Sequence, residues 1–389
     1  MPDATRLLLG GLLTLAVVMG IGRFYYAPLL PLMQRDFGLD TATAGLIGSV
    51  NFAGYVVGSI GATFVPRGAV RRGVFRLAVI ASVVTTLGMG VTESVAAWLA
   101  LRAVAGIASA FGMILAAAFV AEALAAVEEP GRVGWVFGGV GAGIAASGLL
   151  VNFTHAYLTS SALWIVAGAG CVVALPIILS EVRDRKLPPR PEKIAATRRV
   201  PRPLPFLPLL ASYALEGLGF SVFAVFIVAI VKSRPGLEAF GDWVWVAAGL
   251  AGLPSCLFWA WAAERIGFSK ALLTAFLTQI VALALPALSQ SALAALIGAV
   301  LFGGTFLGIV VLTLPLGRHG VGGRGFAVLT VGYGIGQVAG PIAAGYWVTG
   351  PQDWNAALLI SSAIVAAGAA ALGLAMAMGP ARVSNKGEI

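Results

Sequence analysis

Three ionisable residues stand inside long apolar stretches of this chain, and their types suit them to binding charged groups or protons. Arg23 lies in the run that begins near Leu7, and Arg102 and Glu216 lie in two later runs. A charge at membrane depth costs on the order of several kcal/mol unless it faces a polar interior, so each is a candidate functional residue. A guanidinium binds carboxylate, sulfonate or phosphate groups, whereas a desolvated carboxyl group favours its neutral form and can load a proton.

The composition places these runs in a membrane. Of the 389 residues, 59% are hydrophobic and only 11% are charged, and 51 are glycine. Soluble domains carry about 25% charged residues, so this chain has too few to cover a globule with polar surface. Repeated apolar runs of about 20 residues predict a polytopic helical protein in a lipid bilayer, because a β-barrel would show short alternating segments instead.

The apolar runs predict an all-α membrane protein with twelve transmembrane helices. An even number of helices places both termini on the same side of the membrane. The expected spans are 7–31, 42–65, 74–92, 95–121, 133–154, 158–180, 205–231, 243–262, 270–289, 292–316, 324–348 and 355–378.

The basic residues predict the orientation. With both termini cytoplasmic, 20 of the 25 Lys and Arg residues fall on the cytoplasmic side, and only Arg35, Lys232 and Arg234 fall outside. Cytoplasmic loops of membrane proteins carry such an excess. We therefore expect a multi-pass protein of a bacterial-type inner (plasma) membrane. The same distribution accounts for the formal net charge of +9 without a nucleic-acid partner.

One long polar segment divides the chain. Residues 181–203 combine proline with many charges, which predicts a cytoplasmic linker. The linker separates an N-terminal six-helix bundle at 1–180 from a C-terminal six-helix bundle at 204–389, which ends in a short cytoplasmic tail.

The two halves share glycines at a fixed offset. A shift of 197 residues aligns Gly20 with Gly217 and Gly106 with Gly303. Such an offset indicates an internal repeat, and hence two pseudo-symmetric bundles. Closely spaced glycines also fill the predicted fifth and eleventh helices, where we expect them to form helix-packing surfaces.

Several short motifs make the chain resemble the major facilitator superfamily of transporters over its whole length. Glu264-Arg265-Ile266-Gly267 is similar to the family's acidic-Arg-x-Gly loop motif, and Arg102-Ala-Val-Ala-Gly106 to its intramembrane Arg-x-x-x-Gly motif. The stretches around Arg23 and Glu216, Gly20-Ile-Gly-Arg23-Phe24 and Tyr213-Ala-Leu-Glu216, resemble the YbfB/YjiJ-type subfamily. The resemblance implies the major facilitator fold, with helices 1, 4, 7 and 10 around a central cavity, and transport by alternating access.

The loops that carry the motif are expected to act in gating. The copy between the second and third helices lacks the acidic residue, so we expect the N-terminal half to close through a different charge network. Glu122, which ends the fourth helix, is expected to be solvated or paired with Arg132. The predicted gating residues are Arg67, Arg71, Arg72, Glu264, Arg265 and Gly267.

The depths of the three buried charges suggest a division of roles. Arg23 lies roughly 8 Å and Arg102 roughly 9–10 Å below the outer boundary, and Glu216 lies about 15 Å from the cytoplasmic one. We expect the two arginines to bind an anion and Glu216 to couple transport to protons. Three alternatives stay open: Arg102 bonds only to backbone, Arg23 pairs with Glu216 across the cavity, or Glu216 is a permanently paired structural residue.

Polar and aromatic residues of the same helices are further candidates for binding substrate. Each has the alternative role of a packing or interface residue. They are Tyr26, Asn51, Tyr55, Tyr213, Phe220, Trp259, Tyr333 and Gln337.

The sequence favours transport over catalysis. It contains no Gly-Lys-Ser/Thr nucleotide loop, no nucleophile–base grouping and no His pair at metal-ligand spacing. We therefore expect a monomeric secondary transporter without a cofactor, driven by the proton gradient, for a small organic solute that is anionic or zwitterionic and partly apolar. The alternatives are a proton-driven exporter of drugs or hydrophobic cations and a non-transporting sensor that keeps the carrier fold.

Overall fold

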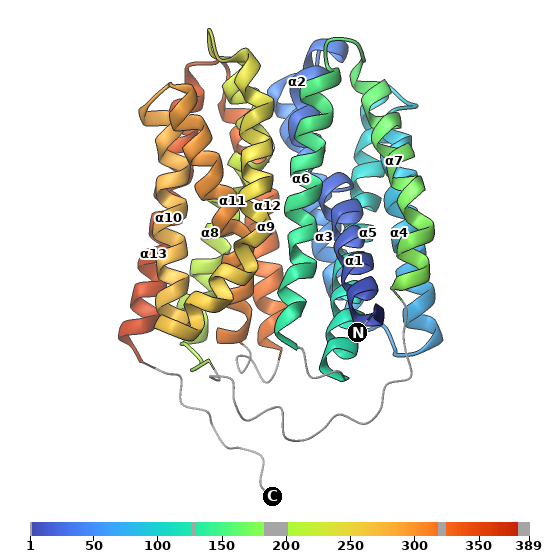
Figure 1. Ribbon diagram of the computed structural model, residues 1–389. Coiled ribbons are helices and arrows are strands. Elements are labelled where there is room, and N and C mark those ends of the chain that lie inside the picture. Colours follow the sequence, from blue (N-terminus) through green and yellow to red (C-terminus); the bar gives the residue numbers. More distant parts are fainter. Residues whose placement is uncertain (1, 127–129, 183–200, 318–323, 380–389) are drawn as a thin grey trace, which may run out of the picture.

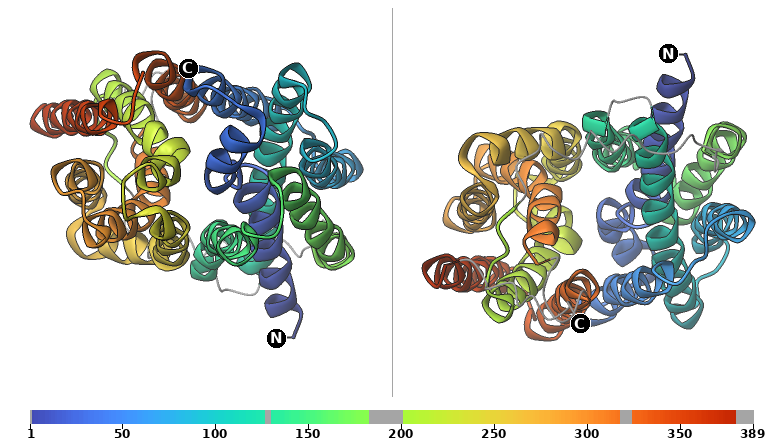
Figure 2. Two further views of the ribbon diagram at one scale, coloured as in Figure 1. Left: turned by 90° about the horizontal axis from the view of Figure 1, so that it is seen from above. Right: turned by 90° about the horizontal axis from the view of Figure 1, so that it is seen from below.

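The computed structural model describes residues 2–126, 130–182, 201–317 and 324–379. Over these ranges its regular structure is helical, and 12 helices are long and apolar enough to cross a membrane, as predicted. They stand side by side in two bundles, the first half of the chain in one and the second half in the other (Figures 1 and 2). We call the end where α7 ends and α8 begins the linker end, and the opposite end the far end.

The N-terminal bundle begins with a first span that is interrupted near its middle. The span covers Thr5–Phe37 and is built from three helical segments. The elements of this half are α1 Pro2–Leu15, η1 Ala16–Ile21, α2 Tyr26–Phe37, α3 Thr41–Ala62, α4 Ala69–Met89, α5 Val95–Ala126, η2 Pro130–Val133, α6 Gly134–Thr154 and α7 Ser160–Glu181.

The C-terminal bundle contains six long helices and one short turn of helix. They are α8 Phe206–Lys232, η4 Glu238–Phe240, α9 Gly241–Ile266, α10 Phe268–Leu288, α11 Ala292–Leu316, α12 Gly325–Trp347 and α13 Asp353–Ala377.

Three helices start at the far end with side-chain caps that the sequence supplies. Asp40 precedes α3 and accepts a 2.7 Å bond from the Thr43 backbone N–H, which lowers the pKa of that carboxyl group. Thr159 and Ser291 do the same for α7 and α11. Such caps satisfy backbone donors that a helix leaves open at its start.

Several predicted boundaries are wrong. The first span does not end at residue 31 but runs to Phe37, because Pro28 falls in the first turn of α2, where its missing N–H costs nothing, and α2 continues past Pro31. Four of the six predicted gating residues are also helical: Arg71 and Arg72 lie in the first turn of α4, and Glu264 and Arg265 in the last turn of α9.

Two glycines make the short connections at the linker end. Gly267 alone separates α9 from α10 and has φ +91, and Gly68 precedes α4 with φ +90. A backbone in this region favours glycine because it has no Cβ. The connections occupy matching places in the two halves.

Packing between helices follows the internal repeat. A Cβ at Gly106 would strike the carbonyl oxygen of Asn51, and a Cβ at Gly303 would strike that of Ala248. Both pairs are related by the same shift of 197 residues (303 − 106 and 248 − 51). The helix α5 therefore packs on α3 in the same way as α11 packs on α9.

The glycine-rich helices form packing surfaces, as predicted. On α6, Gly138 and Gly141 allow close approach of the α9 backbone at Leu253, and Gly139 allows that of α1 at Leu12. At the far end, α3 and α12 close the seam between the halves, because Gly45 lies directly against the carbonyl oxygen of Pro341.

Gly45→Ala is expected to push the halves apart at the far end. The new methyl group would meet a backbone oxygen, which cannot move away as a flexible side chain can. Spin labels on the loops before α3 and after α12 should report a longer distance. Gly170→Ala on α7 is the control, since its Cβ would meet no atom within 4 Å. An unchanged distance distribution for the Gly45 variant would contradict the expectation.

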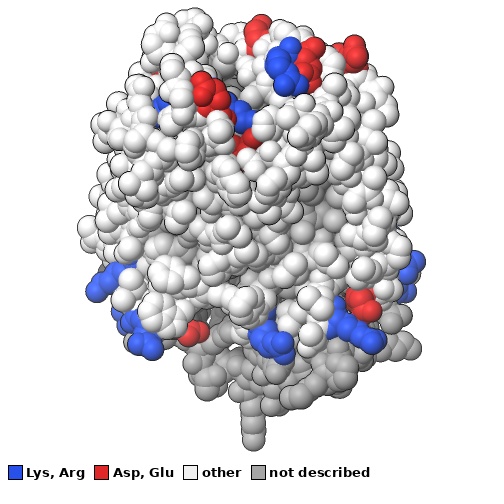
Figure 3. Space-filling view, turned by 45° about the horizontal axis from the view of Figure 1, so that its top comes forward, with Lys and Arg blue, Asp and Glu red and all other residues white. Residues whose placement is uncertain are grey.

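Charged side chains are distributed unequally between the two ends. In Figure 3, basic side chains with a few acidic ones among them line the linker end, and acidic and basic side chains lie together at the far end. This is the distribution on which the predicted orientation rests.

Candidate functional site

The first span breaks at residues 22–25, in the middle of its bundle. Directly after the π-helix η1, the backbone N–H groups of Gly22 and Phe24 bond five residues back, to Val17 and Met19. After the break, Ala27 bonds only three residues back, to Phe24. The break leaves the carbonyl groups of residues 22 and 23 outside the helical ladder, so both need other donors.

Arg102 supplies those donors. Its Nη1 donates to the Gly22 carbonyl oxygen at 3.0 Å and its Nη2 to that of Arg23 at 2.8 Å. Only 2% of Arg102 is exposed, and its guanidinium lies 5.2 Å from the centre of the Tyr26 ring. The structure thus places Arg102 in the alternative role of a backbone-binding residue, where it holds the two parts of the first span together.

Arg23 instead extends its side chain into a cavity. Its guanidinium carbon lies 3.9 Å from the centre of the Tyr55 ring and 4.8 Å from that of Phe52. Its Nη2 donates to Gln337 Oε1 at 3.1 Å, whereas Nε and Nη1 are buried without a hydrogen-bond partner. None of the ion pairs found among the described residues involves Arg23.

The cavity lies between the two bundles and contains about 760 Å³ of free space, the part open to solvent included. Its wall is mostly apolar and aromatic. Six of the predicted binding residues line it: Arg23, Tyr55, Tyr213, Phe220, Tyr333 and Gln337.

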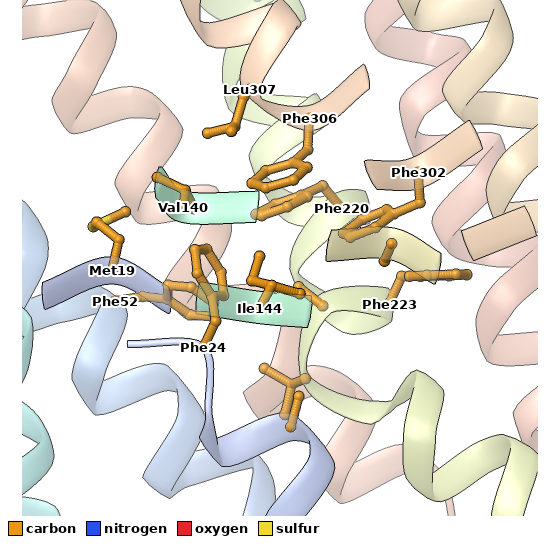
Figure 4. Close-up of a cluster of buried hydrophobic side chains, with 14 of the residues drawn as sticks. Met19, Phe24, Phe52, Val140, Ile144, Phe220, Phe223, Phe302, Phe306 and Leu307 are labelled. Carbon is orange, nitrogen blue, oxygen red and sulfur yellow. The ribbon is translucent and has the colours of Figure 1, made fainter. Parts of the chain in front are cut away.

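The cavity extends toward the linker end and is closed toward the far end. Leu314 near the end of α11 and Phe326 near the start of α12 line its mouth. At its inner limit, Phe24 of the first half meets Phe306 of the second edge to face at 5.9 Å, and Phe220 stacks on Phe306 (Figure 4). These rings separate the cavity from the far end.

Glu216 lies outside the cavity, in the interior of the second half. It is completely buried, and its Oε1 accepts a 2.7 Å hydrogen bond from Gln279 Nε2 on α10. Tyr213 and Tyr333 stack on each other with ring centres 4.2 Å apart, line the cavity and interact electrostatically with Glu216. The tyrosine pair therefore lies between the carboxyl group and the cavity.

Arg23 and Glu216 do not form the charge pair that was considered from the sequence. Each is hydrogen-bonded to a different glutamine, Gln337 and Gln279. The repeat placed the two charges at similar levels, but level does not fix the face of a helix from which a side chain projects.

Three other predicted binding residues have packing roles. The Tyr26 hydroxyl donates to the Ala44 carbonyl oxygen, Asn51 Nδ2 to that of Arg102, and Trp259 Nε1 to that of Gly304. None of the three lines the cavity. Their polar groups join neighbouring helices instead.

The predicted gating residues Arg67 and Arg71 of the first half have an acidic partner, although the loop motif there contains no acidic residue. Arg71 donates to both carboxylate oxygens of Glu122, at 2.9 and 2.7 Å, and lies 4.6 Å from the centre of the Phe119 ring. Arg67 Nε lies 3.8 Å from the same carboxylate. Glu122 thus pairs with arginines at or just before the start of α4, because α5 continues far enough to bring it there.

The second half differs at the matching place. The guanidinium of Arg265 lies 5.3 Å from the centre of the Trp261 ring, and Glu264 is exposed. Both residues belong to the last turn of α9 rather than to a loop.

Several functional candidates were missed. Phe24, Met113 and Phe306 line the cavity, but a single apolar residue in an apolar helix carries no signal. Gln279 did carry one, as an uncharged polar residue in the apolar run at 270–289. A buried carboxyl group needs a polar partner, and Gln279 is such a residue within a neighbouring apolar run.

The fold defines the class of protein. Twelve helices in two pseudo-symmetric bundles around a central cavity form the major facilitator fold. The nucleoside transporter NupG superposes with a TM-score of 0.71 at 13% identity, covering 97% of this chain and 99% of NupG. A point mutant of NupG gives 0.71 and 13% over 96% and 100%. A bacterial homologue of the human lysosomal transporter Spinster, inward-facing and occupied, gives 0.68 and 15% over 97% of both chains.

The family assignment is narrower. Residues 15–377 match the family described as "Uncharacterised MFS-type transporter YbfB", and the chain belongs to that family. No curated protein sequence matches it. It is a multi-pass membrane transporter of the major facilitator superfamily and not an enzyme, as the sequence motifs suggested.

Proposed function

We propose that this transporter carries a small organic anion, or a zwitterion with an anionic group, by alternating access and couples it to protons. The observation that carries the proposal is the guanidinium of Arg23. It lines the cavity, has no carboxylate partner among the described residues, and keeps Nε and Nη1 without hydrogen bonds. A buried charge without a counter-ion is costly, and a bound anion would remove that cost.

The remaining wall of the cavity supports a partly apolar substrate. Tyr55 covers one face of the Arg23 guanidinium, and Phe24, Phe220 and Phe306 bound the inner end. An anion with an apolar or aromatic body would place its charge at Arg23 and its body against these rings.

Proton coupling is proposed for Glu216. Protonation removes a negative charge from behind the Tyr213–Tyr333 pair, so the positive charge of Arg23 acts on the anion without opposition. Ionisation would weaken anion binding. This order, proton first and anion second, describes symport by a monomer that needs no cofactor beyond the gradient.

The alternative functions have less support. An exporter of hydrophobic cations would have to place a cation beside an unpaired arginine. The sensor alternative rested on the missing acidic residue of the gating motif, and the pair of Glu122 with Arg71 supports Glu122 as a substitute for that residue.

The test is uptake into proteoliposomes. A thermal-shift screen of organic acids on the purified protein identifies a ligand, and an imposed pH gradient should then drive its accumulation. Glu216→Gln is expected to abolish accumulation and to spare exchange of ligand across the membrane, because its amide cannot release a proton. Glu93→Gln, which changes an exposed carboxylate in the loop before α5, is the control. Unchanged accumulation by the Glu216 variant would remove it from the mechanism.

A further inference from the structure

Glu216 and Gln279 form a buried pair with two oxygens left over. Both side chains are 0% exposed, and Gln279 Nε2 lies 2.7 Å from Glu216 Oε1. Glu216 Oε2 and Gln279 Oε1 have no hydrogen-bond partner among the described residues. More than about 90% of buried polar groups are hydrogen-bonded, so two open oxygens on side chains already in contact require an explanation.

The groups around the pair supply no positive charge. On α8 itself the ionisable neighbour is Tyr213. On α12 it is Tyr333, whose hydroxyl is a second hydrogen-bond donor to the Glu216 carboxyl group and beyond which Arg23 lies in the cavity. The helix α11 has no ionisable residue, and α10 has only Lys270 at its exposed start, about 13 Å from Gln279 along the helix. The helix α13 has only Asp353, in its first turn.

The ionisable residues of the two other helices beside α8 are engaged elsewhere or lie far along the helix. On α2, Tyr26 bonds to Ala44, and Arg35 pairs with Asp36. On α9, Asp242 pairs with Lys232 at 2.7 Å. The remaining ionisable residues of α9 are Cys256, Glu264 and Arg265. An ionised Glu216 would therefore have two neutral donors, the Gln279 amide and the Tyr333 hydroxyl, and no cation in contact, which is an unfavourable site for a carboxylate.

A single proton satisfies every atom of the pair. A carboxylic acid and a primary amide each carry a donor beside an acceptor. When Nε2 donates to Oε1, a proton on Glu216 Oε2 can donate to Gln279 Oε1, which forms two complementary hydrogen bonds. We propose that Gln279 is the positioning residue that holds the coupling proton on Glu216, an inference that rests on the proposed function of Glu216.

The pair also links the proton to movement of a helix that lines the cavity. Without the proton, Gln279 Oε1 faces a carboxylate oxygen, and two acceptors repel each other. Proton release therefore loosens α8 from α10, and α8 carries the cavity residues Tyr213 and Phe220.

Infrared difference spectra between acid and alkaline pH test the pair in the full chain in lipid. The wild type should show the carbonyl band of a doubly hydrogen-bonded carboxylic acid, and Glu216→Gln should remove it. Gln279→Met keeps the length of the side chain but removes the N–H donor, so the band should move to higher wavenumber. Gln279→Asn, which withdraws the amide by one methylene, should shift it likewise. Thr278→Val should leave it unchanged, because that hydroxyl bonds to Thr274 within α10.

The outcomes separate this inference from the proposed function. Any of three results would overturn the inference. They are a wild-type Glu216 band at the position of a free acid, the absence of a Glu216-dependent band, and a band that neither Gln279 variant shifts. The expected shifts without gradient-driven uptake would support the pair and reject proton-coupled transport. Gradient-driven uptake together with a band that neither Gln279 variant shifts would support proton-coupled transport and reject the pair. The wild-type position decides the inference even if the variants fail to fold.

Discussion

Arg23→Gln is expected to lower the affinity for the anionic ligand by about 100-fold or more while leaving the unliganded protein as stable as the wild type. Two lost hydrogen bonds to a charged group cost about 3 kcal/mol or more, which corresponds to that factor. Stability is spared because the wild-type charge is buried without a counter-ion, and the smaller amide removes that cost. Ligand titration by calorimetry and thermal unfolding without ligand measure the two effects.

The matched variant Arg23→Lys keeps the charge but not the planar group that stacks on Tyr55, so its affinity should be intermediate. A neutral ester or amide of the same ligand should bind weakly to the wild type and lose little more in the Gln variant. Equal affinity of the wild type and Arg23→Gln for the anion would show that Arg23 does not bind it.

Arg102→Ala should show the opposite pattern, a large loss of stability. It would leave the buried carbonyl groups of Gly22 and Arg23 without donors, at about 1–3 kcal/mol each. The apparent melting temperature in detergent should fall, and ligand affinity should fall with it because Arg23 loses its anchor. The control is Arg265→Ala, which removes an exposed arginine at the end of α9 whose guanidinium lies beside the Trp261 ring. A melting temperature equal to that of the wild type would contradict the role assigned to Arg102.

The sequence predicted the helices well because length and hydropathy decide which segments cross a membrane. It also identified the buried charges Arg23, Arg102 and Glu216, since each is conspicuous within an apolar run. It could not assign their partners. The role of Arg102 depends on carbonyl groups freed by the break at residues 22–25, and backbone groups leave no trace in the residue types.

The sequence also could not show from which face of a helix each polar or aromatic side chain projects. In a bundle buried on most sides, Tyr26 and Trp259 carry the same aromatic signal as Tyr55 and Tyr213, yet the first two bond to neighbouring backbone and the others line the cavity. Because α8 is apolar all round, its sequence does not indicate from which face Glu216 projects, and in the structure its side chain bonds to Gln279 of α10.

The break in the first span also determines how force passes through the protein. The backbone of Arg23 is held by Arg102 of α5 while its side chain faces the cavity, so an anion bound there as proposed would pull on α5 rather than on the irregular turn alone. The backbone bonds of that turn run five, four and three residues back instead of forming one regular ladder, so we expect it to be the joint between α1 and α2. Under the proposed function, ligand occupancy and the bend of the first span would therefore be coupled through Arg23.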